Sequence, residues 1–256
     1  MFSLDPRGGH NRYKFKIDFF EKWTPKMAYI LGFLYADGDI EDVRRSSRTQ
    51  YITFASIDKE ILEVIKNAMG SEHNINYRAP RKVTYSNGKT YESSGIYRLR
   101  IGSKKMFDDL IKLGLTPRKS LTIIFPNNIP DNCFRHFIRG YFDGDGCVTI
   151  KKGKGKYGQP ILKGIAVIFT SGSKLFLEGL RDNACRFANF GKRSVYYGSN
   201  AYYLKYDTFE SLKWFKFFYG GNLSELFLER KFNVFKKYFQ IRPIRIDGET
   251  ANILKK

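Results

Sequence analysis

The chain has 256 residues, with 45 lysines and arginines against 25 aspartates and glutamates, which gives a formal net charge of +20. The excess is not confined to a tail, because residues 1–130 carry +8 and residues 131–256 carry +12. With 42% apolar residues and 16% aromatics, the composition excludes a disordered basic segment. It predicts a folded protein whose partner is a polyanion.

Three classes of protein are disfavoured by the same composition. No apolar run approaches the roughly 18–20 residues of a membrane-spanning helix, and the N-terminal ten residues lack the apolar centre of a signal peptide. The three cysteines share no CxxC spacing, which argues against a disulfide framework and a structural zinc site. We therefore expect a soluble intracellular protein with no membrane partner.

An internal repeat organises the chain. Residues 29–40 (YILGFLYADGDI) align without gaps on residues 137–148 (FIRGYFDGDGCV), which places Gly32 on Gly140 and Asp37 on Asp145. The first copy begins with Thr24-Pro25, a capping residue followed by the proline favoured in the first turn, and ends in Ala-Asp-Gly, a helix stop. Each copy is therefore predicted to be an apolar helix that ends at an aspartate.

The segments that follow each helix also match. Residues 53–65 and 169–180 each predict a strand end followed by an amphipathic helix. Residues 96–101 (IYRLRI) and 201–206 (AYYLKY) alternate as half-buried strands do, and helices are predicted at 103–114 and 209–218. Residues 151–160 (KKGKGKYGQP), lying between two strand candidates, are expected to be a long mobile hairpin loop.

The repeat predicts an α+β protein with two pseudo-twofold-related halves, each reading helix, two strands, helix, two strands, helix. The expected divisions are an N-terminal extension (1–23), a first half (24–115), a linker (116–130), a second half (131–240) and a C-terminal tail (241–256).

Asp37 and Asp145 carry the chemistry that the repeat suggests. A carboxylate at the carboxyl end of a helix lies beside partial negative charge and needs an offsetting cation. The small residues Gly32 and Gly140 allow two helices to approach closely, and this packing would bring the two carboxylates together. Oxygen ligands on a shallow site suit Mg²⁺. A basic surface with such a site fits hydrolysis of a phosphodiester.

At these residues the sequence resembles the LAGLIDADG homing endonucleases, in the monomeric form with two motif copies. ILGFLYADG (30–38) and IRGYFDGDG (138–146) stand in place of the motif. The resemblance implies two αββαββα halves whose antiparallel sheets form a saddle over duplex DNA. It also implies that Asp37 and Asp145, with the carbonyls of Ala36 and Gly144, bind the metal. The first copy departs from the commonest form, since Tyr35 stands where the second copy has Asp143.

Further site residues follow from the resemblance. The family places a lysine near each scissile phosphate, which here predicts catalytic roles for Lys119 and Lys231 in the recurring Arg-Lys dipeptides; a plain phosphate contact is the alternative. Ser56 and Ser171, at aligned strand ends, are expected to hold water near the metals. The residues expected to contact DNA are Arg44, Arg45, Arg48, Gln50, Arg78, Arg81, Arg98, Arg100, Lys151, Lys152, Arg193, Tyr197, Tyr203 and Lys205.

The leading hypothesis is a Mg²⁺-dependent endonuclease that cuts both strands of a long asymmetric target and leaves short 3′ overhangs. Mn²⁺ is expected to substitute, and Ca²⁺ to support binding without cleavage. The expected partner is double-stranded DNA, in the compartment that holds the target genome. Two alternatives stay open: a maturase that binds its own intron RNA, and a catalytically silent DNA-binding regulator.

Overall fold

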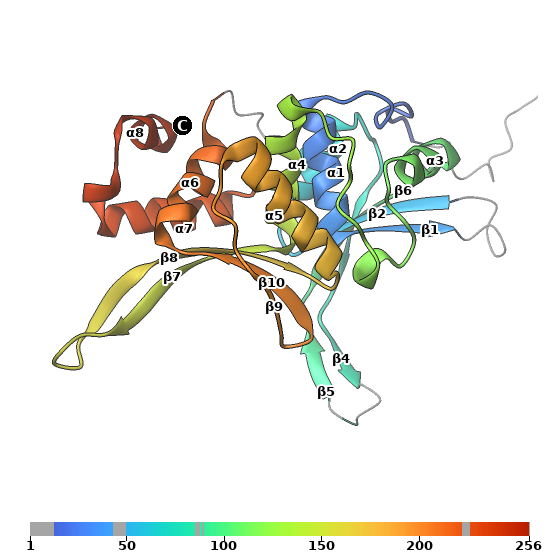
Figure 1. Ribbon diagram of the computed structural model, residues 1–256. Coiled ribbons are helices and arrows are strands. Elements are labelled where there is room, and N and C mark those ends of the chain that lie inside the picture. Colours follow the sequence, from blue (N-terminus) through green and yellow to red (C-terminus); the bar gives the residue numbers. More distant parts are fainter. Residues whose placement is uncertain (1–12, 43–49, 85–87, 89, 222–225, 256) are drawn as a thin grey trace, which may run out of the picture. The chain divides into compact units, whose positions relative to one another are not determined.

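A computed structural model describes residues 13–42, 50–84, 88, 90–221 and 226–255 (Figure 1). The chain divides into two compact units. The first holds Met1–Trp23 and Asp37–Lys119, and the second holds Thr24–Ala36 and Ser120–Lys256. The helix of the first motif copy therefore packs within the second unit, although its final aspartate is grouped with the first.

The first unit is built on a four-stranded antiparallel sheet in the order β1-β2-β6-β3, with a separate two-stranded sheet β4-β5. Helices α2 and α3 pack against β2 and bury their apolar faces on it. The elements are β1 (Gly38–Asp42), β2 (Gln50–Ser56), α2 (Lys59–Ala68), β3 (Ile75–Arg78), β4 (Arg81–Thr84), β5 (Thr90–Ser93), β6 (Ile96–Gly102) and α3 (Lys104–Lys112).

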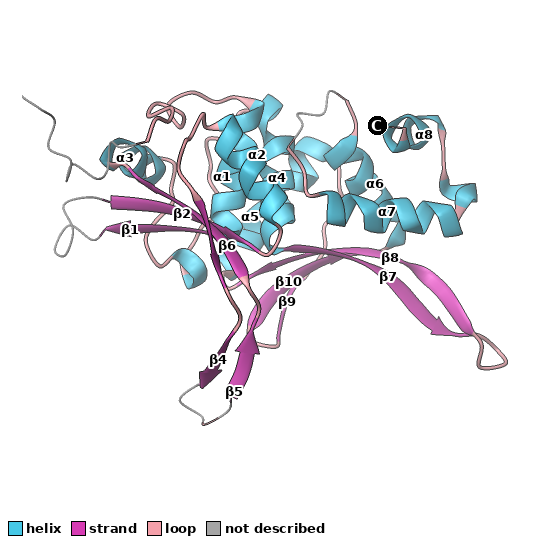
Figure 2. Cartoon of the chain, turned by 180° about the vertical axis from the view of Figure 1, so that it is seen from behind, coloured by secondary structure: helices cyan, strands magenta, loops and turns pink. Residues whose placement is uncertain are grey.

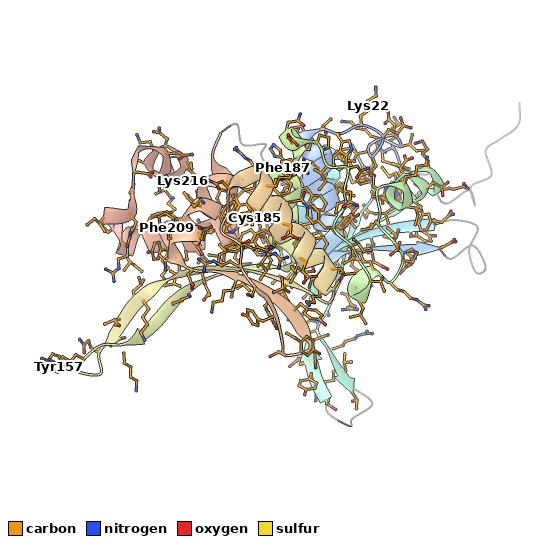
Figure 3. The ribbon with its side chains drawn as sticks, in the orientation of Figure 1. Lys22, Tyr157, Cys185, Phe187, Phe209 and Lys216 are labelled. Carbon is orange, nitrogen blue, oxygen red and sulfur yellow. The ribbon has the colours of Figure 1, made fainter. Side chains whose placement is uncertain are left out.

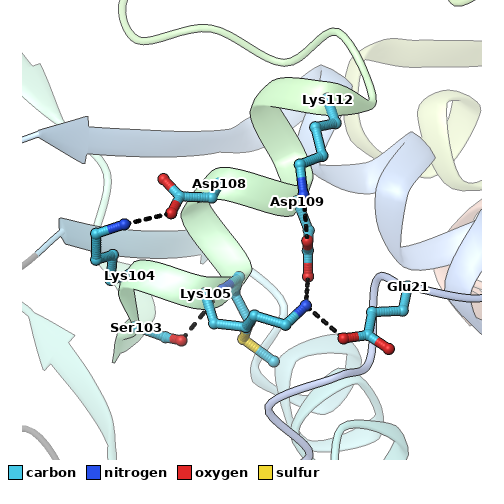
Figure 4. A network of polar contacts seen from close by, with 8 residues as sticks. Glu21, Ser103, Lys104, Lys105, Asp108, Asp109 and Lys112 are labelled. Atoms are coloured by element: carbon cyan, nitrogen blue, oxygen red, sulfur yellow. Dashed lines mark hydrogen bonds and ion pairs between the residues drawn. The ribbon is translucent and has the colours of Figure 1, made fainter.

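Helix α3 is fixed by short-range polar contacts. The Ser103 hydroxyl caps its first turn by accepting a hydrogen bond from the Met106 N–H. Lys105 Nζ lies 2.6 Å from an Asp109 oxygen and 2.5 Å from a Glu21 oxygen, which fastens the N-terminal segment to the helix (Figure 4). These half-exposed ion pairs contribute little to stability individually and serve mainly to set the helix position.

The second unit repeats the same sheet order, β7-β8-β10-β9, again fully antiparallel. Among the described residues its helices all lie on one face of this sheet, and the opposite face carries no helix (Figure 2). The elements are α1 (Pro25–Asp37), α4 (Asp131–Asp145), β7 (Gly146–Lys154), β8 (Pro160–Ser171), α5 (Lys174–Ala188), β9 (Val195–Gly198), β10 (Ala201–Tyr206), α6 (Thr208–Tyr219), α7 (Glu229–Ile241) and α8 (Gly248–Leu254), with 3₁₀ turns at Lys119–Leu121 and Pro243–Arg245.

The expected mixed α/β architecture of two repeated halves is confirmed, and two local predictions are corrected. Residues 151–160 are not a long loop, because β7 continues to Lys154 and β8 begins at Pro160. The result is a long hairpin whose tip residue Tyr157 is 84% exposed (Figure 3). The sequence analysis also predicted no helix after 209–218, whereas the structure has α7, and Lys231 lies in its first turn.

Helices α1 and α4 are in main-chain contact at the repeated glycines. A Cβ added at Gly32 would lie 2.0 Å from the Phe137 carbonyl oxygen, and one at Gly140 would lie 1.9 Å from the Tyr29 carbonyl oxygen. Tyr29 and Phe137 occupy equivalent repeat positions, so the contact is symmetric in sequence. The predicted role of the small residues is therefore seen directly. None of the described helices is long and apolar enough to cross a membrane.

Candidate functional site

The end of α4 is the best-defined part of the candidate site. Asp145 is the last residue of the helix and is half-buried, as is Gly144. The ammonium of Lys231, itself 5% exposed, donates to the carbonyl oxygens of Phe142 (2.5 Å), Asp143 (2.8 Å), Gly144 (3.1 Å) and Gly146 (2.5 Å). Lys231 thus supplies a positive charge where the helix dipole is negative, and it offsets the unfavourable placement of a carboxylate there.

Asp143, two residues before the motif aspartate, is buried in the α1–α4 contact. Its Oδ2 accepts hydrogen bonds from the Tyr29 hydroxyl (2.7 Å) and from the Leu228 N–H (2.9 Å). Burial raises the pKa of this carboxyl, and the positive charge of Lys231 opposes that rise. One of its two oxygens is therefore taken up by α1 and by the segment before α7, and the expectation that this position does not bind metal stays a prediction.

The departure of the first motif copy has a packing explanation. Tyr35, the repeat counterpart of Asp143, places its ring 5.2 Å from that of Phe137, the counterpart of Tyr29. At one repeat position the helices are joined by a hydrogen bond between the Tyr29 hydroxyl and the Asp143 carboxylate. At the equivalent position they are joined by the contact between the rings of Tyr35 and Phe137. The substitution of Tyr35 for an acid changes an interhelical contact and leaves the motif aspartate in place.

The end of α1 has a different set of charged neighbours. Asp37 is exposed and ends the helix, and Ala36 is half-buried. Asp39 follows on β1; burial and the nearby Glu41 raise the pKa of its carboxyl, and the positive charge of Lys119 opposes them. Lys119 is 6% exposed, which matches the burial of Lys231. Both Arg-Lys dipeptides therefore present a buried lysine, each beside the strand that follows a motif helix.

The two serines have the same local role in both repeats. Ser56 Oγ accepts a hydrogen bond from the Asp58 N–H, and Ser171 Oγ accepts one from the Ser173 N–H. Each serine ends a strand and shapes the turn into the next helix. These contacts occupy one lone pair of each hydroxyl, so the expected contact with water remains a prediction.

The helix-free face of the second sheet carries part of the predicted DNA-binding set. Leu204 and Tyr206 point toward the helices, with the Tyr206 ring 5.3 Å from that of Trp214, so Tyr203 and Lys205 lie on the opposite face. Strand register pairs Tyr203 with Tyr196, and their rings stack at 5.6 Å. Tyr197 instead pairs with Tyr202. Both Tyr196 and Tyr197 are exposed, but Tyr196 is the one that lies beside Tyr203, and the sequence could not indicate this because it depends on strand register.

Residues on the first sheet divide in the same way. Leu99 and Ile101 are fully buried, which puts Arg98 and Arg100 on the other face, as predicted. Arg100 contacts the Glu41 carboxylate at 2.6 Å and lies over the Tyr51 ring at 3.7 Å. These contacts hold the guanidinium in a defined place on that face.

Three arginines of the first unit, Arg78, Arg81 and Arg98, lie close enough together for their charges to interact. Burial, together with the charges of Arg98 and Arg81, lowers the pKa of Arg78. The Nε of Arg78 is buried and has no hydrogen-bond partner among the described residues. Mutually repelling cations of this kind are stabilised by an anion.

The other residues predicted to contact DNA differ in their exposure. Gln50 is 2% exposed and faces the core, so its side chain does not reach the surface of the sheet in this structure. Lys151 is paired with Asp207 at 2.5 Å. Lys152 and Arg193 are exposed. Arg44, Arg45 and Arg48 lie outside the described residues.

The end of α4 presents one carboxylate, Asp145, and carboxylate oxygens are ligands that Mg²⁺ and Ca²⁺ prefer. The neighbouring carbonyl oxygens of Phe142, Asp143, Gly144 and Gly146 are hydrogen-bonded by the Lys231 ammonium. Among the described residues, no group of three or more His, Cys, Asp or Glu side chains forms a metal cage. An ion here would share its coordination with water and with oxygens of a bound partner.

Comparison with known proteins places these features in one family. The model of the LAGLIDADG-like domain matches residues 24–112 and 133–217, together more than half of the chain. The chain belongs to the LAGLIDADG family. The two matched segments follow the internal repeat, and each contains one motif helix and its aspartate.

Solved structures of this family share the fold. The homing endonuclease I-WcaI, bound to its DNA recognition sequence, superposes with a TM-score of 0.56 at 14% identity, covering 91% of this chain and 95% of that one. The meganuclease I-SmaMI bound to uncleavable DNA gives 0.55 at 16% identity, covering 91% and 96%.

One related protein matches only part of this chain. An uncharacterised protein of Methanocaldococcus jannaschii is 25% identical over 129 residues, which is 50% of this chain. The match spans 41% of that relative's length.

Proposed function

We propose that this chain is a site-specific DNA endonuclease that hydrolyses both strands of a long asymmetric duplex with a divalent metal ion. One observation carries the proposal: both motif copies keep their aspartate at a helix end, and a buried lysine accompanies each copy. Two aspartates at the negative ends of helices are unfavourable for the fold, so a scaffold that only bound nucleic acid would gain nothing from them. Retention of Asp37, Asp145, Lys119 and Lys231 thus favours an active enzyme over a silent regulator.

The metal would be held at the motif ends. Asp37 with the Ala36 carbonyl, and Asp145 with the Gly144 carbonyl, are the proposed ligands. Mg²⁺ bound there would neutralise a scissile phosphate and acidify an attacking water. Mn²⁺ would substitute, and Ca²⁺ would support binding without cutting; I-SmaMI has been solved with an uncleaved DNA target in the presence of calcium ions.

The two lysines would act on the phosphate. A buried ammonium is a preorganised positive charge, and such charges stabilise negative charge that develops in a transition state. Lys231 already lies beside the Asp145 end of α4, held by main-chain oxygens. We assign Lys119 the same task beside the first motif copy, on the basis of its burial and its repeat position.

DNA would lie along the helix-free faces of the two sheets. Stacked Tyr196 and Tyr203 with Lys205 on one sheet differ in chemistry from Arg98 and Arg100 on the other, so the two half-sites would differ in sequence. Arginine forms bidentate hydrogen bonds with guanine, which favours base reading by the first unit. Because the repeats are carried on one chain, we propose that a monomer suffices.

The decisive test is selection of cleaved products from a randomised duplex library in Mg²⁺. We expect a single long consensus without palindromic symmetry and cuts in both strands with short 3′ overhangs. Failure to enrich any sequence, at protein concentrations that bind DNA in a gel shift, would refute the proposal.

Binding of structured RNA is a second candidate, favoured by cations on the helix side of the β7–β8 hairpin. Two hollows of about 460 and 570 Å³ adjoin there and share Leu162. No carboxylate lines them. Their basic lining residues are Lys152, Lys163, Lys237, Arg242 and Arg245. Tighter binding to intron RNA than to duplex DNA of equal length, abolished by charge reversal at Arg242 and Arg245, would support this role.

A further inference from the structure

We infer that Asp143 is a positioning residue for Lys231: its carboxylate anchors the start of α7 and so keeps the lysine ammonium at the end of α4, beside Asp145. The catalytic consequence rests on the function proposed above, whereas the placement of the lysine can be tested without any activity.

The inference rests on reciprocal capping between two helices. Helix α7 begins after Leu228, whose side chain cannot accept a hydrogen bond from the first turn. Asp143, from α4, accepts the hydrogen bond of the Leu228 N–H at 2.9 Å and places negative charge at the positive end of α7. Lys231, from the first turn of α7, in turn donates to the last carbonyls of α4. Each helix supplies the cap that the other lacks.

The carboxylate is itself held rigidly. Asp143 is 3% exposed and Tyr29 is fully buried, and the Tyr29 hydroxyl donates to the same oxygen that accepts from Leu228. The second oxygen, Oδ1, has no hydrogen-bond partner among the described residues. An apolar residue of similar size would stabilise such an interior as well or better. The buried Asp143 carboxylate lowers the stability of the fold, and we explain its presence by the position that it gives to the start of α7.

Among the described residues, this reciprocal capping occurs at the second motif copy and not at the first. Tyr35, the counterpart of Asp143, contacts Phe137 and Phe176 through its ring and has no carboxylate to offer a second helix. Disturbing Asp143 should therefore affect the cleavage centre of the second copy and spare that of the first. Substitution of Tyr35 by Phe keeps these two ring contacts and is a matched control.

The first experiment measures the reactivity of Lys231 toward an amine-acylating reagent in the full-length protein, by peptide mass spectrometry. We expect strong protection in the wild type and in Tyr35→Phe, and labelling at least about tenfold faster in Asp143→Ala. Asp143→Asn, which keeps an acceptor oxygen for the Leu228 N–H, should restore most of the protection. Exposed Lys174 reports on general reactivity, and circular dichroism reports on folding.

Equal protection of Lys231 in folded Asp143→Ala and in the wild type would overturn the inference. If that variant fails to fold, Asp143→Ser replaces it, because a serine hydroxyl is too short to reach Leu228.

The second experiment separates this inference from the proposed function. On a cleaved target with each strand labelled, Asp143→Ala should slow one strand by about 10–1000-fold, the range associated with losing a preorganised charge, while the other strand is cut at the wild-type rate. Equal rates on both strands in the variant would contradict the inference. An inactive wild type would instead refute the proposed function, and the labelling result would still decide the placement.

Discussion

Gly32 lies against the main-chain carbonyl of Phe137 so closely that a Cβ there would stand 2.0 Å from the oxygen. The partner is backbone and cannot rotate away, so any side chain must push α1 and α4 apart.

Gly32→Ala should therefore lower the free energy of unfolding by about 3 kcal/mol, at the upper end of overpacking costs. Chemical denaturation followed by circular dichroism measures this. Gly248→Ala is the matched control, because its added Cβ would meet no atom within 4 Å beyond its chain neighbours and its own helix backbone, and it should not destabilise the protein. Equal stability of the Gly32 variant and the wild type would show that the helices are not in main-chain contact.

Removing either motif carboxylate should separate binding from cutting. Asp37→Asn and Asp145→Asn remove a negative charge from a helix end, which the fold does not need. We expect specific binding within about threefold of wild type and no double-strand cleavage. A gel shift in Ca²⁺ and a cleavage assay in Mg²⁺ measure the two properties, and cutting near the wild-type rate by either variant would remove that aspartate from the site.

Lys231 should matter for stability as well as for catalysis. Lys231→Met leaves buried carbonyls at the end of α4 without their donor, which costs about 1–3 kcal/mol, and it removes a charge worth about 10–1000-fold in rate. Lys119→Met should slow cleavage similarly. Lys236→Met, an exposed neighbour on α7, should change neither property. Variants that bind DNA less tightly but cut normally at saturation would indicate remote phosphate contacts.

A buried histidine should make the second unit sensitive to acid. Burial, with the charges of Arg139 and Arg135, lowers the pKa of His136 from 6.5 to about 4. The folded state disfavours the protonated ring. The free energy of unfolding is therefore highest above pH 6.5 and falls as the pH drops toward 4. One pKa unit corresponds to about 1.4 kcal/mol, and since the effect is not complete until the pH falls below 4, we expect a loss of about 2 kcal/mol between pH 7 and 4.5.

Thermal melts of wild type and His136→Gln between pH 7 and 4.5 test this expectation. Glutamine keeps an acceptor for Arg139, whose Nη2 lies 3.2 Å from His136 Nδ1. The variant should lose less stability over this range. Parallel pH profiles would mean that His136 titrates normally.

The fold could be predicted from the sequence because its signals are local and occur twice. The gapless repeat located both motif helices, and alternation assigned the buried and exposed faces of 96–101 and 201–206. The small residues predicted close helix packing, which Gly32 and Gly140 show. Helix α7 was not predicted, because the segment from residue 209 to residue 239 is rich in aromatic residues throughout. The apolar spacing of α7 therefore could not be distinguished from that of the neighbouring α6.

The candidate site was only partly predictable for a physical reason. The motif identifies Asp37 and Asp145, but the partners of Lys231 are backbone carbonyls, which leave no mark in a sequence. The sequence predicted only that Asp143 does not bind metal. Its contact with Leu228 could not be predicted, because the two residues are 85 positions apart in the sequence. Tyr196 was not predicted, because strand register alone decides that it, and not Tyr197, lies beside Tyr203 on the same face of the sheet.

The central claim is that metal bound at the two motif aspartates drives hydrolysis of both DNA strands. Strand-resolved cleavage of a selected target, measured in Mg²⁺, in Ca²⁺ and in EDTA, tests it most directly. We predict cutting of both strands with short 3′ overhangs in Mg²⁺, a stable uncut complex in Ca²⁺, and no cutting in EDTA. Undiminished cleavage in EDTA would contradict the account.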